Sequence, residues 1–218
     1  MSQAQVIAVL GAESTGKSTL VRELVAALRS RGLDAVGVPE ALRLFCERTQ
    51  RTPWANEQAA LADEQTRLID EAASRHAIVL ADTSALMTAV YSQVIFHDDS
   101  LLDSALRAHA RCDLTLLTAL DLPWVPDGHQ RDGPHLREPV DAHIRDALMQ
   151  AGLAHAVVMG QGVQRVAHAL SVVEHLLDAP TRAQRAATSP RWRWFCENCD
   201  DGECEQHWLT RPARRDEA

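Results

Sequence analysis

The sequence predicts an α/β fold in which a parallel sheet is covered by helices on both faces. Short apolar runs alternate along the chain with longer segments whose apolar residues recur at helical spacing. Neighbouring parallel strands need crossover connections, which are usually helices, so this alternation favours a parallel sheet. A glycine-rich octet directly follows the first apolar run, at the kind of strand-to-helix loop where open α/β sheets bind ligands.

The expected elements follow one another in strand-then-helix order. Strands are expected at the apolar runs, which are residues 6–10, 35–38, 77–81, 113–117 and 154–158. Helices are expected after the octet as far as Gly32, around Leu42 to Phe45, over 56–75, over 85–95, from Ser100 with Asp103 in a capping-box arrangement, and over 163–177. The segment 121–137 contains three prolines and two glycines, which forbid a regular element there.

Length and charge restrict the domain organisation and the partners. The 218 residues suit one main domain, which we expect over 1–178, followed by a linker over 179–190 and a tail over 191–218. A net charge of −8 argues against nucleic acid as a partner, because binding a phosphate backbone needs clustered positive charge. The apolar runs are far shorter than the roughly 20 residues that span a membrane, so we expect a cytoplasmic protein without a membrane partner.

The octet Gly11–Ser18 fits the phosphate-binding pattern G-x-x-x-x-G-K-[ST] at every fixed position. In such a P-loop, Gly16 lets backbone N–H groups approach phosphates, Lys17 neutralises their charge, and Ser18 can ligate Mg²⁺. Lys17 is the only lysine of the chain, and a compact ammonium fits here where a planar guanidinium would not. The octet therefore predicts a nucleotide site formed by Gly11, Glu13, Ser14, Thr15, Gly16, Lys17 and Ser18.

Absent motifs help to define the nucleotide and the reaction. Common GTPases read guanine with an N-K-x-D motif, which needs a second lysine, so ATP is favoured. Asp82 ends an apolar strand and matches the strand-end acid that holds Mg²⁺, the alternative being an ordinary strand-ending acid. The next residue is Thr83 instead of the water-activating glutamate of motor ATPases. This difference favours phosphoryl transfer to a bound acceptor over ATP hydrolysis.

Two acids and one loop are candidates for handling the acceptor. Glu40 and Asp82 both follow strands, and we expect Asp82 nearer to Mg²⁺ and Glu40 nearer to the acceptor hydroxyl. The alternative for Glu40 is an acid that only starts a helix. The irregular segment 121–137 would act as a lid over the phosphates. Its Trp124 would supply a stacking surface, and its Arg131 and Arg137 would supply positive charge. Alternatively, Trp124 packs into the core under the loop, and the two arginines are exposed residues of a solvated loop.

The tail contains Cys196, Cys199, Cys204 and His207 at C-x₂-C-x₄-C-x₂-H spacing. Three thiolates and an imidazole suit tetrahedral Zn²⁺, and a dication would offset the thiolate charge among the surrounding acids. We therefore expect a structural zinc site in the tail. A free-thiol tail and a redox pair are the alternatives.

Several of these motifs together resemble the ribosylnicotinamide kinase domain of the NadR-like P-loop (AAA-type ATPase) family, over about residues 4–178. They are Gly11–Ser18, Glu40–Arg43, the pair Gln58 and Gln65, Asp82–Thr83, and Pro123–Gly128. The resemblance implies a P-loop NTPase fold and ATP-dependent phosphorylation of the ribose 5′-hydroxyl of nicotinamide riboside. A riboside would then be the small-molecule partner.

The resemblance also implies roles for individual residues. Lys17, Ser18 and Thr19 would serve the nucleotide and Mg²⁺, Asp82 the metal or the substrate hydroxyl, and Trp124 the nicotinamide ring. Together with the motifs above, the candidate substrate-binding residues are Glu40, Arg43, Trp124 and Asp127, and the candidate catalytic residues are Lys17, Glu40, Asp82, Arg131 and Arg137. The alternative function is a nucleotide-dependent switch or binding module whose zinc tail docks a partner.

Overall fold

The structure is a computed structural model that describes residues 4–125 and 133–179. The contacts of the chain divide it after Asp178 into two compact units, and the fold below is that of the first unit, Met1–Asp178. The tail and nearly all of the expected linker lie outside the described residues, as do 126–132 of the expected lid. The domain boundaries expected from the sequence therefore stay a prediction.

Five parallel strands form one sheet in the order β2-β3-β1-β4-β5. Their bounds are β1 Gln5–Leu10, β2 Ala35–Val38, β3 Ile78–Asp82, β4 Leu114–Thr118 and β5 Ala156–Val158. β1 lies at the centre, and its Val9 is paired with Asp82 of β3 and Leu116 of β4. The carboxyl ends of the central strands therefore meet at one edge, where open α/β sheets bind ligands.

Seven α-helices and two 3₁₀ turns occur in the described residues. The helices are α1 Lys17–Ser30, α2 Ala41–Thr49, α3 Gln58–Ala73, α4 Ala85–Phe96, α5 Leu102–His109, α6 Arg137–Gln150 and α7 Gly162–Leu177, and the 3₁₀ turns are Ala55–Glu57 and Pro134–Leu136. Within these described ranges, no helix combines the length and the apolar content that crossing a membrane requires.

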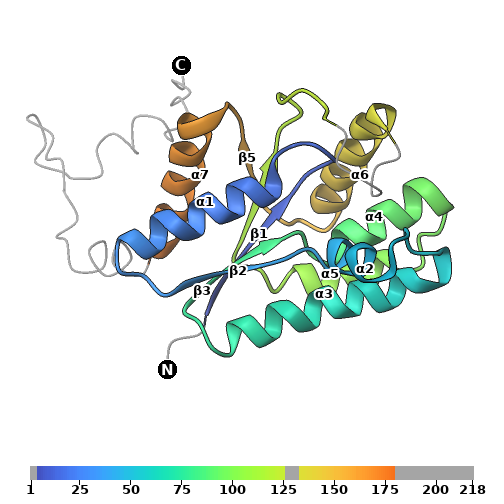
Figure 1. The fold of residues 1–218 in the computed structure, drawn as a ribbon, viewed down its shortest axis with the longest axis horizontal. Coiled ribbons are helices and arrows are strands. Elements are labelled where there is room, and N and C mark those ends of the chain that lie inside the picture. Colours follow the sequence, from blue (N-terminus) through green and yellow to red (C-terminus); the bar gives the residue numbers. More distant parts are fainter. Residues whose placement is uncertain (1–3, 126–132, 180–218) are drawn as a thin grey trace, which may run out of the picture. The chain divides into compact units, whose positions relative to one another are not determined.

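The alternation of side chains along β1 distributes the core between the two faces of the sheet. Ile7 and Val9 belong to a buried cluster with apolar residues of α1 and α7. Ala8 and Leu10 belong to a second cluster with residues of α4 and α6. Figure 1 shows α1 and α7 on one side of the strands and α3, α4 and α5 on the other. The α/β class and the parallel sheet covered on both faces are confirmed.

Three local expectations differ from the structure. The segment 121–137, in which no regular element is expected, contains the 3₁₀ turn Pro134–Leu136. The helix α6 was not expected, although Val140, Ile144, Ala147 and Leu148 have helical spacing and are its buried residues. Its proline lies in the first turn, where a missing N–H costs no helical hydrogen bond. The capping box at Ser100 is wrong, because α5 starts at Leu102 without any side-chain cap.

Candidate functional site

The phosphate loop connects β1 to α1, and its last residues form the start of that helix. Gly16 precedes α1 in the left-handed conformation, at a φ of 76° that glycine adopts without strain. The first N–H groups of a helix have no partner within it and can bind an anion. Lys17 Nζ donates to Ala12 O at 3.0 Å, Ser18 is half-buried, and Thr19 is exposed. These features fit the phosphate site that the octet predicts.

Hydroxyl groups hold the loop against the neighbouring strand. Thr118 Oγ1, at the end of β4, lies 3.0 Å from Leu10 O and 2.7 Å from Thr15 Oγ1. Thr15 Oγ1 in turn donates to Ala12 O at 2.8 Å. Thr15 and Thr118 are both fully buried, so each contact forms away from competing water. These buried contacts therefore stabilise the shape of the loop.

Arg165 of α7 also supports the same loop. Its buried guanidinium donates to Thr15 O at 2.7 Å, to Gly160 O at 2.9 Å and to Asp121 Oδ1 at 2.9 Å. Partial burial would raise the pKa of Asp121, but hydrogen bonds from Gly160 N and Arg165 outweigh it and lower the pKa. No sequence motif marked Arg165, because its partners are backbone atoms and an acid far away along the chain.

Asp82 ends β3 beside the phosphate loop, where the sequence placed the metal-binding acid. Its side chain is buried, and its Oδ1 has no hydrogen-bond partner among the described residues. Asp82 and Ser18 line one cavity of about 680 Å³. A carboxylate and a hydroxyl are oxygen ligands that suit Mg²⁺, which usually keeps few protein ligands and takes phosphate oxygens and water besides. The two residues therefore fit this ion.

No larger metal site is present in the part of the chain that the structure describes, since no three His, Cys, Asp or Glu side chains there are grouped to hold a metal ion. The four expected zinc ligands, Cys196, Cys199, Cys204 and His207, lie outside the described residues. The zinc site stays a prediction.

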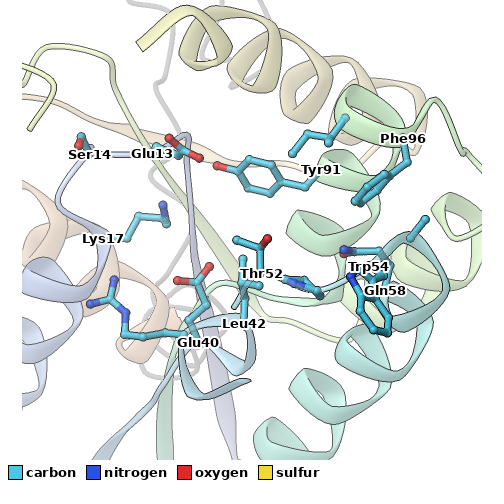
Figure 2. A pocket seen from close by; sticks show the side chains of 14 residues that line it. Glu13, Ser14, Lys17, Glu40, Leu42, Thr52, Trp54, Gln58, Tyr91 and Phe96 are labelled. Atoms are coloured by element: carbon cyan, nitrogen blue, oxygen red, sulfur yellow. The ribbon is translucent and has the colours of Figure 1, made fainter. Parts of the chain in front are cut away.

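A second cavity, of about 370 Å³, starts at the phosphate loop and has the size of a small-ligand site. Glu13, Lys17 and Glu40 line one end, and the aromatic rings of Trp54 and Phe96 lie at the opposite end (Figure 2). Figure 2 also shows the Glu13 carboxylate and the Tyr91 hydroxyl pointing toward one another. The site thus combines charged groups beside the phosphate loop with a flat apolar end.

Glu40 is held in this cavity by a buried glutamine. Gln65 Oε1 accepts a hydrogen bond from Ala41 N at 2.7 Å, and its Nε2 donates to Pro39 O at 3.4 Å. Gln65 is almost fully buried in α3 and so fixes the backbone on both sides of Glu40. Figure 2 shows the Glu40 carboxylate directed into the cavity, on the side of Lys17. Arg43, one turn further along α2, lines both cavities.

The start of the expected lid contacts the phosphate loop. Ser14 Oγ donates to Val125 O at 2.7 Å and accepts from Val125 N at 3.1 Å. Arg137 Nη2 donates to Leu122 O at 2.9 Å. Trp124 is half-buried and is not among the residues that line the cavity of Figure 2. Asp127 and Arg131 lie outside the described residues, and their roles stay predictions.

Sequence reasoning missed the aromatic residues of the cavity. Trp54, Tyr91 and Phe96 come from a loop and from α4, and no motif links them. The only available signal was that Tyr91 is the single tyrosine of the chain. Their grouping depends on how α4 packs beside α3, which local periodicity does not reveal.

A buried histidine, His109, is hydrogen-bonded to the segment that follows Asp82. His109 Nδ1 lies 2.9 Å from Ser84 Oγ, and its Nε2 lies 2.9 Å from Thr115 Oγ1. Ser84 also caps α4 by accepting a hydrogen bond from Leu86 N. Burial lowers the pKa of His109 to about 4, so the ring stays neutral at pH 7, with one nitrogen donating and the other accepting.

This histidine should make folding sensitive to mild acid. Its pKa is about 4 in the folded state against 6.5 for an ordinary histidine, so the unfolded chain binds a proton first as the pH falls. The contribution to stability is complete above pH 6.5 and decreases toward pH 4, by about 2 kcal/mol between pH 7.5 and pH 5. We expect the free energy of unfolding of His109→Gln, measured by urea titration, to lack this decrease between pH 7.5 and pH 5. The prediction would be contradicted if the free energies of unfolding of the parent and the variant decreased by the same amount over this pH range.

Comparisons with known proteins agree with this description. A family model for an AAA domain matches residues 6–165. A crystal structure of NadR protein in complex with NR has a TM-score of 0.64 at 23% identity, and the match covers 79% of this chain and 50% of that one. A crystal structure of NadR protein in complex with NAD and AMP-PNP has a TM-score of 0.63 at 24% identity, with 79% and 49% covered. No curated protein sequence matches the chain.

The match extends over about half the length of the two NadR chains, and at this identity it concerns the fold. The resemblance found in the sequence motifs is thus confirmed for the family and the fold. Since the family model covers most of the chain, from β1 to α7, the protein belongs to the AAA domain family, with a P-loop fold like that of NadR.

Proposed function

We propose that the protein is an ATP-dependent kinase that phosphorylates the ribose 5′-hydroxyl of nicotinamide riboside or a related riboside. The observation that carries this proposal is the cavity in which Lys17 and Glu40 lie at one end and aromatic rings at the other. A riboside has a hydroxyl group at one end and a planar ring at the other. The NadR structures in complex with NR and with AMP-PNP support the same class of ligands.

The phosphate loop would hold ATP, and Lys17 would neutralise charge on its terminal phosphates. In the transfer step, the acceptor oxygen forms a bond to the γ-phosphorus while the bond from phosphorus to the β–γ bridging oxygen breaks. The proton of the acceptor hydroxyl passes to Glu40, and ADP leaves. Catalysis of this kind comes mainly from positioning and charge neutralisation, so Glu40 needs no unusual pKa.

Ser18 and Asp82 would hold Mg²⁺, since they line one cavity and Asp82 Oδ1 is buried without a hydrogen-bond partner among the described residues. Neutralisation of phosphate charge is the chemistry that the ion supplies when bound. Glu40 lines both cavities, whereas Asp82 lines only the one that Ser18 also lines. This difference supports Asp82 as the metal residue and Glu40 as the acceptor residue.

The two acids should therefore respond differently to the loss of charge. We expect Glu40→Gln to lower kcat on the order of a hundredfold, with the Mg²⁺ concentration for half-maximal rate unchanged, because general-base assistance is lost. Asp82→Asn should raise that Mg²⁺ concentration. The measurement is acceptor-dependent ADP release over a Mg²⁺ titration. A shifted Mg²⁺ requirement in Glu40→Gln and an unchanged one in Asp82→Asn would reverse the two roles.

A screen of ribosides, beginning with nicotinamide riboside, tests the function itself. The kinase should release ADP only when an acceptor is present and in equal amount to the phosphorylated riboside. Slow ADP release that no riboside stimulates would reject the kinase and favour the nucleotide-dependent switch.

A further inference from the structure

Trp54 forms part of the aromatic end of the cavity although it lies at the protein surface. It precedes the 3₁₀ turn before α3, and 63% of its surface remains exposed. A large apolar side chain with this exposure would normally change rotamers freely. Its surroundings show instead a set of contacts that fix both its backbone and its ring.

The ring of Trp54 lies against Arg51. The guanidinium carbon of Arg51 is 4.1 Å from the centroid of the indole and 5.1 Å from that of Phe45. A planar guanidinium at this distance makes a favourable cation–π contact and covers one face of the indole. Trp54 lines the cavity, but Arg51 is not among its lining residues. A ligand that stacks on this indole would therefore use the face that Arg51 leaves uncovered.

Glu57 fixes Arg51 in turn. Its two carboxylate oxygens each accept a hydrogen bond of 2.7 Å from the guanidinium, and Oε2 also accepts from Trp54 N at 2.8 Å. The hydrogen bonds from Arg51, followed by the one from Trp54 N, lower the pKa of Glu57 to about 2, so its charge persists at working pH. The same carboxylate thus holds the backbone of Trp54 and the cation that packs on its ring.

We propose that Trp54 is the wall on which a planar aromatic ring of the acceptor stacks, and that Arg51 and Glu57 are positioning residues that hold this wall. The inference builds on the proposed kinase function and names the residue against which the aromatic ring of the acceptor packs, together with the two residues that hold it in place. An indole that is ordered before binding loses little entropy when the ligand arrives. Opposite it, the phosphate loop end of the cavity receives the hydroxyl of the acceptor.

The test follows the indole N–H signals of the five tryptophans of the full chain by NMR, with Trp54 assigned from a Trp54→Phe variant. The probes are nicotinamide riboside, adenosine and, as a compound without an aromatic ring, ribose. We expect at least one ring-bearing probe to shift the Trp54 signal, whereas ribose does not. Acceptor-dependent ADP release is measured in parallel.

Variants test the positioning residues. Arg51→Lys keeps the charge but loses the bidentate contact with Glu57. We expect it to raise the dissociation constant and the KM of the ring-bearing probe roughly three- to tenfold and to leave kcat unchanged. Arg67→Lys is the matched control, because Arg67 makes an equally bidentate pair with Glu64 at 2.8 Å on α3, and neither residue lines the cavity. Trp54→Phe should retain more affinity than Trp54→Leu.

The outcomes separate this inference from the kinase proposal. ADP release stimulated by a riboside without a shift of the Trp54 signal would leave the kinase standing and overturn the inference. A shift without ADP release would support the wall and reject the kinase. If no ring-bearing probe moves the Trp54 signal, or if only the Trp124 signal moves, the inference is wrong whatever the ADP measurement shows.

Discussion

Lys17→Ala should lower acceptor-dependent ADP release at least about a hundredfold while the free energy of unfolding stays close to that of the parent. Removing a preorganised cation from the transferring phosphates costs rates of this order. The fold should be unaffected, because Lys17 is only half-buried and its ammonium donates a hydrogen bond to Ala12 O within its own loop. Steady-state kinetics and urea titration measure the two quantities.

Lys17→Arg is the matched control for this prediction, since it preserves the charge. We expect it to remain strongly impaired, because a planar guanidinium does not fit a site built for a compact ammonium.

The single lysine also permits a chemical test: ATP should protect Lys17 from an amine-selective reagent, which can otherwise modify only this side chain and the N-terminal amine. If a folded Lys17→Ala variant turned over ATP at a rate within tenfold of the parent, the proposed role of Lys17 in the nucleotide site would be wrong.

Gly11→Ala should destabilise the protein by about 3 kcal/mol or more and abolish ATP binding. A Cβ on Gly11 would lie 1.9 Å from Thr118 Oγ1 and 3.0 Å from Thr15 Oγ1, both of them buried. The backbone φ of 147° adds strain for any residue with a side chain. Overpacking costs about 1–3 kcal/mol and backbone strain a similar amount, so the two effects together exceed an ordinary substitution.

Urea titration and equilibrium binding of a fluorescent ATP analogue measure this prediction. The double variant Gly11→Ala with Thr118→Ser should recover little stability, since the hydroxyl that meets the Cβ is retained. The pair Gly11→Ala with Thr118→Ala should recover part of it, because the contact is relieved and the backbone strain remains. A Gly11→Ala variant with parental stability and ATP affinity would show that the loop can take another path.

The local patterns of the sequence were sufficient for the class of the fold and for the phosphate loop. The five apolar runs became the five strands with shifts of at most two residues, because burial on both faces of a parallel sheet demands continuous apolar sequence. The loop motif could be read for the same reason: all of its residues are consecutive, and its function depends on local backbone geometry. The overlooked α6 had a readable apolar spacing, but the proline at its start concealed it.

The acceptor side of the site was decided by tertiary structure. Trp54, from the loop before α3, lines the same cavity as Tyr91 and Phe96 of α4, and α3 and α4 pack together. Arg165 contacts the phosphate loop although it lies 150 positions further along the chain. Gln65 was visible as a motif residue, yet its task of fixing Glu40 depends on hydrogen bonds to Pro39 and Ala41 across two elements. The sequence by itself therefore determined the fold class and the nucleotide loop, which rest on periodicity and on neighbouring residues. Only the tertiary structure decided which side chains form the cavity, because those contacts join residues that no local pattern relates.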